Sequence, residues 1–574
     1  MAKTFTISDT NAVLNFSKSY CTTKIELLKS KGFHAICKRH IEYIKRKDKP
    51  LYHKLNAINT NDRLLIEDLI AIFKLLLVMD IENIKKIHTD LERYLEKSDD
   101  ILEFVETMYD YWRTLERYAL IHNKKTQMGL QNQQFIKSMD DFEKLVLDAY
   151  RTISESLMGK KNRVYRQLIA GVNAGIVLNE TKLEVEKGVY DQLRAIPIIE
   201  SIILNPPFIT YPRRNTRTGV FKEVDTNPLI GVDLDKNEFM CYPARVGKYF
   251  ALIYFHKDFM SMGVTLGNLF ELADTDFIRD HKPDMIYVYG AKDVEEKTAF
   301  YHDKDEDLFI GYASYSDEFD YFGYMKKMIL TLHNVKGIDH GGLPIHGAMA
   351  IITMDNGLQK NVIIMGDSGA GKSETLEALR TLEDNGITDI KIIFDDMGIL
   401  FESEGKIKAY GTEIGAFVRL DDLDPGYAYR TIDRSIFMNP DKINARIVIP
   451  VATYDDITKG YEIDMFLYAN NYDNHDQPIV FYTDEKEAKQ VFVDGARFAK
   501  GTTSEIGLVK SYFANPFGPV QRQAQTDVLI DKYFDKMFAE KIQVGALMTR
   551  LGIKGFERTG PELAANSLLE YLKK

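Results

Sequence analysis

Apolar residues recur every three or four positions through most of the first third of the chain. The spacing is clearest in residues 64–95, 101–121 and 135–157, where glycine and proline are scarce. Such spacing forms one face of an α-helix, so it predicts a mostly helical accessory domain over residues 1–195. One stripe of large apolar side chains is expected to be buried in the core of this domain, although a partner-binding face has the same pattern: Tyr109, Trp112, Leu115 and Tyr118.

The pattern changes near residue 200, where prolines and glycines interrupt the helical spacing. Apolar residues then alternate with polar ones in 249–254 and 285–289, which is typical of β-strands. We therefore expect a mixed α/β substrate lobe over residues 196–335 and an α/β nucleotide-binding lobe over residues 336–574. The active site is expected in the cleft between these two lobes.

The stretch Asn361–Arg380 combines a short apolar strand, a glycine-rich turn and the start of a helix. Only such a turn lets several backbone N–H groups converge on a triphosphate, with a helix N-terminus behind them. Lys372 would reach the β- and γ-phosphates, and the Ser373 hydroxyl would hold Mg²⁺. The stretch thus predicts ATP binding, the alternative being a turn without a ligand. The G-x-x-x-x-G-K-[ST] pattern and the residue after it are Gly366, Asp367, Ser368, Gly369, Ala370, Gly371, Lys372, Ser373 and Glu374.

A second apolar strand, Asp389–Asp396, ends in two carboxylates, Asp395 and Asp396. A Walker-B strand delivers a carboxylate to the phosphate-bound cation in this way. Downstream of a glycine-rich phosphate loop, this pair predicts cation binding, although two aspartates are also common where a strand turns.

Three arginines lie within five residues of a predicted turn: Arg213, Arg214 and Arg217. Guanidinium groups bind carboxylates and phosphates through two parallel hydrogen bonds, so these residues are candidates for binding an anionic substrate. A solvent-facing loop explains them equally well.

Composition excludes some partners. The net charge is −11, which argues against nucleic acid, because affinity for a phosphate backbone comes from clustered Lys and Arg. Three distant cysteines form no disulfide or zinc pattern, which favours a cytoplasmic setting. No apolar run is long enough to span a bilayer, so no membrane contact is expected.

The motif Y-x-x-x-M-K-K runs from Tyr321 to Lys327, and a histidine follows 19 positions later at His346, before the glycine-rich loop and the Asp-Asp strand. Together and in this order, these motifs resemble the phosphoenolpyruvate carboxykinase superfamily. Two later segments are also similar to this family, Tyr429–Asn439 and Gly501–Glu505. The resemblance covers residues from about 321 to the C-terminus, and its lysine-to-histidine interval is that of the ATP-dependent members.

The resemblance implies a role for each matching residue. Lys327, His346 and Asp396 would bind Mn²⁺, with Lys327 neutral, and Asp395 would contact the nucleotide-bound Mg²⁺ through water. Tyr321 would lie near the substrate carboxylate or CO₂, and Arg558 near the adenine. The cofactors implied are ATP, Mg²⁺ and Mn²⁺, and the substrate is a small carboxylate.

Two departures from the family leave the reaction open. The arginine that helps hold the transferring phosphoryl group is replaced by Phe481-Tyr482, although Arg497 or Arg522 would be a substitute. The loop residues Asp367, Ser373 and Glu374 are closer to HPr kinase/phosphorylase, a relative of the carboxykinases.

These observations support three hypotheses. The first is a carboxykinase-like enzyme that converts oxaloacetate and ATP to phosphoenolpyruvate, CO₂ and ADP, with Lys372, Asp395, Asp396, Lys327 and Tyr321 as its catalytic residues. The second is a kinase of the same fold that phosphorylates a hydroxyl group, with Asp395 or Asp396 as general base. The third is a nucleotide sensor without catalysis. The helical domain would serve a protein partner or self-association.

Overall fold

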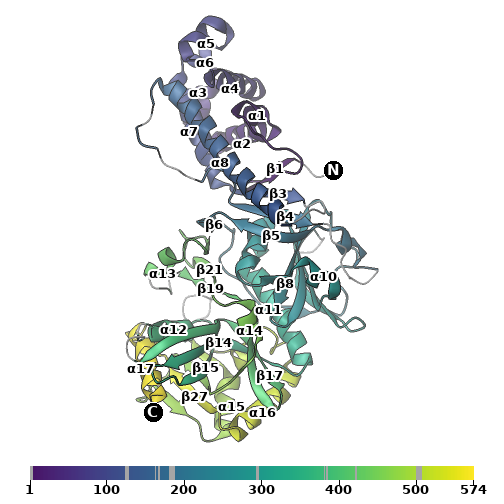
Figure 1. Ribbon diagram of the computed structural model, residues 1–574, viewed down its shortest axis with the longest axis vertical. Coiled ribbons are helices and arrows are strands. Elements are labelled where there is room, and N and C mark those ends of the chain that lie inside the picture. The colour runs from purple at the N-terminus through teal and green to yellow at the C-terminus, as the bar shows by residue number, and fades with distance from the viewer. Residues whose placement is uncertain are drawn as a thin grey trace. The chain divides into compact units, whose positions relative to one another are not determined.

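The chain folds into two compact units in the computed structural model. Unit 1 comprises Met1–Glu180 and Ile199–Asn205, and unit 2 comprises Thr181–Ile198 and Pro206–Lys574. The predicted mixed α/β class is confirmed, since both units combine helices with sheets (Figure 1). The structure describes residues 4–573 except 123–127, 162, 166–168, 180–187, 293–296, 381, 383–385, 421–422, 424 and 500–506, and except the side chains of 128–131, 425 and 427.

Unit 1 contains a small sheet in the order β1-β2-β3-β4-β5. Strands β1 and β2 are antiparallel, whereas β2, β3 and β4 run parallel to one another. The strands are β1 Phe5–Ile7, β2 Asn11–Asn15, β3 Glu116–His122, β4 Ala174–Asn179 and β5 Ile198–Leu204. The helices are α1 Lys24–Lys29, α2 Lys31–Lys47, α3 Lys49–Asn56, α4 Asp62–Leu76, α5 Ile81–Ile87, α6 Glu92–Leu95, α7 Ser98–Thr114 and α8 Met128–Met158.

The predicted helix over residues 101–121 is wrong in its second half. Helix α7 ends at Thr114, and Glu116–His122 forms strand β3 between two parallel neighbours. A parallel strand is covered on both faces, so its side chains form a continuous apolar run, which is hard to distinguish from a buried helix by pattern alone. The stripe of Tyr109, Trp112, Leu115 and Tyr118 is buried as expected, but it spans both elements.

Unit 2 contains two large sheets and a small one. The first large sheet has the order β8-β9-β11-β13-β12-β7, with β10 beside β8. The second has the order β22-β18-β17-β14-β15-β23-β27-β24, with β16 beside β14. The small sheet has the order β19-β21-β20-β6. Strands β25 and β26 form a separate pair. Both predicted lobes, 196–335 and 336–574, lie mainly in this one unit.

The strands of unit 2 are β6 Phe208–Thr210, β7 Lys222–Glu223, β8 Phe239–Val246, β9 Tyr249–His256, β10 Glu271–Leu272, β11 Met285–Ala291, β12 Thr298–Asp303, β13 Leu308–Ser314, β14 Leu343–Met354, β15 Gln359–Met365, β16 Ile387–Phe394, β17 Met397–Ser403, β18 Lys406–Gly411, β19 Gly415–Arg419, β20 Ile436–Met438, β21 Arg446–Pro450, β22 Tyr461–Glu462, β23 Met465–Asn470, β24 Ile479–Phe481, β25 Ala496–Phe498, β26 Leu508–Lys510 and β27 Gln543–Met548. Its helices are α9 Met260–Thr265, α10 Thr275–Asp280, α11 Phe322–Asp339, α12 Lys372–Arg380, α13 Pro425–Arg430, α14 Tyr454–Thr458, α15 Glu485–Asp494, α16 Gln523–Ala539 and α17 Thr559–Leu572.

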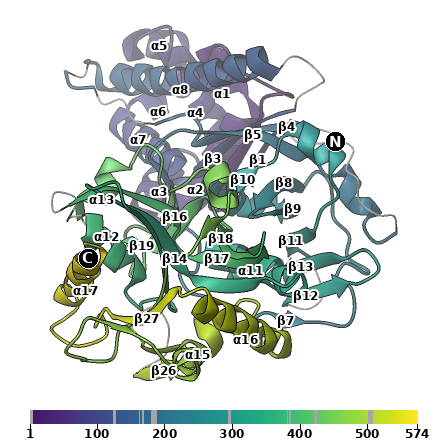
Figure 2. The same cartoon turned by 60° about the horizontal axis from the view of Figure 1, so that its bottom comes forward.

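Helix α11 is the buried centre of unit 2. It packs against β11 and β13 of the first sheet and against β14 and β17 of the second. Nearly all of its residues are buried, because a helix between two sheets has no solvent face. Strand β14 adds a second central feature, since its start pairs with β17 and its end pairs with β16, while β15 lies along its other edge (Figure 2).

No helix in the described part of the chain has the length and apolar character that crossing a bilayer requires.

Candidate functional site

The glycine-rich loop adopts the predicted strand–loop–helix arrangement. Strand β15 ends at Met365 and α12 begins at Lys372. Gly369 and Gly371 have φ angles of +78° and +96°, which favour glycine. A side chain at Gly371 would also meet Thr549, with Cβ only 2.6 Å from the threonine Cβ. These positions therefore require glycine for the loop to form.

The loop is held in place from behind. The Thr549 hydroxyl donates a 2.6 Å hydrogen bond to the carbonyl of Ala370, and the Asn471 side-chain amide donates a 2.9 Å bond to the carbonyl of Gly369. Both residues follow the ends of central strands, β27 and β23. The loop geometry is therefore set by the sheet, as a preorganised anion site requires.

Two side chains that the sequence assigns to phosphate and cation binding, Lys372 and Ser373, form hydrogen bonds within and beside the loop. The Lys372 ammonium donates to the carbonyls of Gly366 and Asp367, at 2.7 and 3.1 Å. The Ser373 hydroxyl donates a 2.9 Å bond to Asp395, which follows the end of β16. Burial raises the pKa of Asp395 to about 6. The residues matched to Walker A and Walker B thus meet.

Lys327, His346 and Asp396, predicted as metal ligands, converge on one point. The Asp396 Oδ2 atom is 2.7 Å from the Lys327 ammonium, and its Oδ1 atom is 3.0 Å from His346 Nε2. They come from α11, β14 and the turn between β16 and β17. Because Asp395 lies next to Asp396 in the chain, this cluster adjoins the loop.

The backbone around Ala514 orients His346. The Nδ1–H of His346 donates a 2.9 Å hydrogen bond to the Ala514 carbonyl, so Nε2, 3.0 Å from Asp396 Oδ1, is the ring nitrogen that a neutral imidazole would offer to a metal ion. Phe513 and Ala514 both have positive φ angles, 50° and 46°, which is strained for residues with side chains. Burial lowers the pKa of His346, and the nearby Lys372 adds to this effect.

Sequence reasoning missed two further members of the cluster, Lys326 and Glu413. The Lys326 ammonium is fully buried, 2.6 Å from Asp396 and 2.9 Å from Glu413. Burial alone would raise the pKa of Asp396, but Lys326 and Lys327 hold it well below its usual value. Burial raises the pKa of Glu413 to about 7. The adjacent lysines were a visible signal, whereas nothing in the sequence marks Glu413.

The pKa values of Lys327 and its neighbour Lys326 shift in opposite directions. Burial lowers the pKa of Lys327, and Asp396 only partly opposes this. Asp396 and Glu413 instead raise the pKa of Lys326, against the effect of burial. One lysine therefore remains a cation, while the other is the better donor of a nitrogen lone pair.

The donor set fits a transition-metal ion only if Lys327 is counted. Among the described residues, no group of three or more His, Cys, Asp and Glu side chains is arranged to hold a metal. With Lys327, two nitrogen atoms and a carboxylate face one another, and nitrogen and oxygen atoms are the donors that first-row divalent metal ions bind.

Arg497 is one of the two proposed substitutes for the missing arginine, and it contacts the loop. Its Nε–H donates a 2.9 Å hydrogen bond to the Asp367 carboxylate. Burial would raise the pKa of Asp367, but His346 and Arg497 lower it. Arg522 instead pairs with Glu223 and Asp339.

The three clustered arginines separate in the structure. Arg213 and Arg214 form exposed ion pairs with Asp317 and Glu318. The Arg217 guanidinium lies 5.0 Å from the centre of the Phe517 ring, and the Lys327 ammonium lies 4.7 Å from the same ring. Burial lowers the pKa of Arg217. Only Arg217 is therefore shown beside the proposed metal ligands.

The remaining predicted residues are spread around unit 2. Tyr321 is buried as the residue before α11, and its ring lies 6.1 Å from that of Phe417. Phe481 packs against Tyr571, and Tyr482 packs against a separate apolar cluster. The Arg558 side chain is 92% exposed and pairs with Glu562. The segment Gly501–Glu505, matched to a family loop, lies outside the described residues.

A pocket of about 150 Å³ opens beside the loop. Ser373, Glu374, Asp395 and Asp396 line one side, and strands β19 and β21 line the other. Two arginines that sequence reasoning missed lie in register on these strands: Arg419 and Arg446. The pocket therefore combines carboxylates and guanidinium groups next to the glycine-rich loop.

The chain matches no model of a known protein family, and no curated protein matches it.

Proposed function

We propose that unit 2 catalyses ATP-dependent phosphoryl transfer, and that its reaction is that of a phosphoenolpyruvate carboxykinase: oxaloacetate and ATP give phosphoenolpyruvate, CO₂ and ADP. The main support for this proposal is that Lys327 and His346 both contact Asp396, directly beside the Ser373–Asp395 pair. Burying two lysines, a histidine and carboxylates together is costly for stability, and such clusters concentrate where chemistry occurs.

The glycine-rich loop and Lys372 would bind the nucleotide. The loop amides would hold the phosphate oxygens, and the Lys372 ammonium, now on two loop carbonyls, would neutralise charge on the transferring group. Ser373 and Asp395 would hold Mg²⁺, which fits their direct hydrogen bond. The loop is already fixed by Thr549 and Asn471, so it needs little rearrangement.

Lys327, His346 and Asp396 would hold Mn²⁺, which supplies a Lewis acid for the carboxylate substrate and its enolate. The Ala514 carbonyl keeps the His346 lone pair aimed at the cluster, and Lys326 remains charged beside Asp396. Arg217 would bind a substrate carboxylate, and its position beside the Phe517 ring supports this role, whereas Arg213 and Arg214 have carboxylate partners on the surface.

The direct test is a mass-spectrometric assay for phosphoenolpyruvate with oxaloacetate, ATP, Mg²⁺ and Mn²⁺. We expect formation of phosphoenolpyruvate that needs all of them. We also expect the purified protein to bind one Mn²⁺ and to lose it in His346→Ala and Asp396→Asn, but not in the surface control Asp456→Asn. Absence of oxaloacetate turnover by protein that binds Mn²⁺ would refute the carboxykinase reaction.

A second candidate is a kinase of the same fold that phosphorylates a hydroxyl group of a metabolite or protein. The pKa of Asp395, raised to about 6 by burial, suits a general base near neutral pH. The packing of Phe481 and Tyr482 into apolar clusters also offers no phosphoryl-binding cation at those positions. ATP turnover that requires another acceptor, and not oxaloacetate, would favour this kinase.

The same assay addresses a nucleotide sensor. Tight ATP binding without turnover of any acceptor, unchanged in Lys327→Ala, would favour sensing without catalysis. Loss of turnover in Lys327→Ala with ATP binding retained would support an enzyme.

A further inference from the structure

Unit 1 contains an apolar pocket that no part of the proposed reaction uses. Its volume is about 400 Å³, within the range of pockets that hold small molecules. Protein interiors normally pack without voids larger than a water molecule, so this space is far larger than a packing defect. Nine aromatic side chains lie in its wall. Six of them carry no hydroxyl group, namely Phe5, Phe16, Phe33, Phe73, Trp112 and Phe142, and the other three are Tyr20, Tyr109 and Tyr150.

Three of the four polar groups in the aromatic wall are already bonded to the protein, and the fourth, the Tyr109 hydroxyl, has no hydrogen-bond partner among the described residues. The Trp112 indole N–H donates to the carbonyl of Ala170 at 2.6 Å, and the Tyr20 hydroxyl donates to the carbonyl of Ser138 at 2.9 Å. The Tyr150 hydroxyl donates to Glu106. A ligand in this part of the pocket would therefore meet apolar surface, which selects a hydrocarbon or aromatic body.

One side of the pocket has the opposite character. The first turn of α2 lines it, and among the described residues the backbone amides of Lys31 and Gly32 have no hydrogen-bond acceptor. The lining also includes Lys18 and Lys31, both exposed, and neither forms an ion pair within the described part of the chain. No Asp or Glu is among the lining residues that the structure describes.

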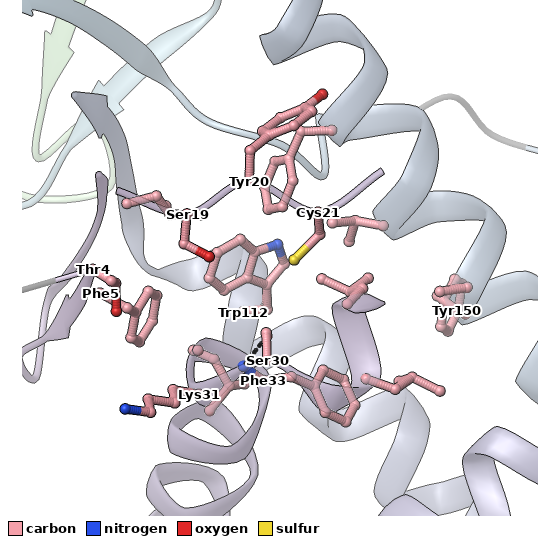
Figure 3. Close-up of a pocket in the computed structure, with 18 of the residues that line it drawn as sticks. Thr4, Phe5, Ser19, Tyr20, Cys21, Ser30, Lys31, Phe33, Trp112 and Tyr150 are labelled. Carbon is pink, nitrogen blue, oxygen red and sulfur yellow. Dashed lines mark hydrogen bonds between the residues drawn. The ribbon is translucent and has the colours of Figure 1, made fainter. Parts of the chain in front are cut away.

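The geometry around Trp112 joins these two sides. Figure 3 shows the indole ring in the middle of the pocket, with the side chains of Ser19 and Cys21 directed toward it and with Phe5 and Lys31 across from Cys21. A molecule lying along the indole would thus have its body among aromatic rings and one end near the α2 amides. Two lysines and a helix N-terminus favour a negative charge at that end.

We propose that unit 1 binds a small amphiphile, with an apolar straight-chain or aromatic body in the pocket and a single carboxylate at the first turn of α2. This binding is independent of the reaction of unit 2, and it gives the helical domain a ligand of its own.

Trp112 makes the test direct because it is the only tryptophan in the chain. Dodecanoate is titrated into the full-length protein, and the fluorescence of Trp112 is followed below the concentration at which dodecanoate forms micelles. We expect a saturable change with one molecule bound per chain. Naphthoate, hexanoate and hexadecanoate distinguish an aromatic body from a straight chain and give its preferred length. Dodecanol, which lacks the charge, should bind at least tenfold more weakly.

Two sets of variants separate the two ends of the site. K18Q/K31Q removes only exposed charges and should weaken dodecanoate binding at least tenfold while leaving dodecanol unchanged. The matched control K38Q/K47Q removes two exposed lysines outside the pocket wall and should change neither. Ala149→Leu narrows the pocket and should weaken both ligands.

The rate of alkylation of Cys21 gives an independent measure of ligand binding. Cys21 is half-buried, whereas the other two cysteines are fully buried. Dodecanoate should slow its alkylation by iodoacetamide. No saturable fluorescence change, equal binding of dodecanol and dodecanoate, or binding unaffected by both K18Q/K31Q and Ala149→Leu would overturn the proposal.

Discussion

Each unit buries positive charge, but in a different way. In unit 1 the Arg117 guanidinium donates hydrogen bonds to five backbone carbonyls, those of Trp112, Arg113, Leu115, Ile169 and Gly171. In unit 2 Lys326 and Lys327 both contact the single carboxylate of Asp396. The arginine is held by neutral groups of the backbone, whereas the lysines are held by another charge.

This difference separates a structural role from a chemical one. The five carbonyls bond to all three nitrogen atoms of the Arg117 guanidinium, which ties the C-terminal end of α7 to the segment before β4. The lysine cluster instead lines up nitrogen and oxygen donors beside the glycine-rich loop, and the pKa values of its two neighbouring lysines shift in opposite directions. Buried charge alone does not mark a functional site; its convergence with other titratable groups does.

The largest effect is expected from Lys372→Ala. If unit 2 transfers a phosphoryl group, losing this ammonium should lower turnover at least about 1,000-fold, because charge stabilisation in such sites has that weight. ATP-dependent product formation is the measurement, and the exposed Lys391→Ala is the control. Unit 1 should be unaffected, so the thermal unfolding seen by Trp112 fluorescence should not shift. A fall in turnover below tenfold would contradict a catalytic role.

Arg117→Leu tests the structural side of the comparison. It leaves five buried carbonyls without their donor, so we expect the unfolding free energy of unit 1 to fall by about 3 kcal/mol or more. Urea unfolding followed by Trp112 fluorescence measures it. Arg113→Leu removes a half-exposed ion pair with Asp110 and should cost less than about 1 kcal/mol. Equal effects of both variants would refute the special role of Arg117.

We expect His40 to make the stability of unit 1 depend on pH. This side chain is fully buried, its Nε2 atom is 3.0 Å from the Thr107 hydroxyl, and burial lowers its pKa to about 4. Between pH 6.5 and 4 the unfolded chain therefore binds a proton that the folded unit does not. The stability that neutral His40 contributes is complete above pH 6.5 and is lost as the pH falls toward 4. This loss is on the order of 3 kcal/mol, because each pKa unit corresponds to about 1.4 kcal/mol.

Urea unfolding at a series of pH values measures this loss. His40→Phe should make the curve flatter between pH 6.5 and 4, whereas the exposed His53→Phe should leave its slope unchanged. An unchanged slope in His40→Phe would show that other groups cause the acid sensitivity.

The smallest effect is expected from substitutions of the clustered arginines, which should differ in their effect on kcat/KM. Arg217→Ala should lower kcat/KM for the carboxylate substrate about tenfold, or about 1.4 kcal/mol, because Arg217 lies beside the ring that Lys327 also contacts. Arg213→Ala should change it less than twofold, since Arg213 pairs with Asp317 on the surface. Steady-state kinetics decide between them, and similar losses in both variants would contradict the assignment.

The parts of the site that depend on neighbouring residues were predictable. The strand before the glycine turn, the helix from Lys372 and the strand before Asp395 follow local patterns of apolar residues and glycine. The meeting of Lys327, His346 and Asp396 agrees with the resemblance in sequence, although their roles stay a prediction.

Other parts depend on contacts between distant segments. Glu413 lies in a turn without periodicity, and the Ala514 carbonyl reaches His346 only through two strained backbone positions, which no local pattern reveals. The strands of unit 1 are three to seven residues long and alternate with helices, so helical spacing dominates the pattern around them. Their pairing joins residues more than 100 positions apart, as between β2 and β3.

The division of the chain has a consequence for synthesis on the ribosome. Residues 199–205 belong to unit 1 but follow a passage, 181–198, that belongs to unit 2. A nascent chain halted at residue 195 would lack all of β5, and its first unit would carry an uncovered sheet edge that invites aggregation. Recombinant expression of this unit alone should therefore extend through residue 205.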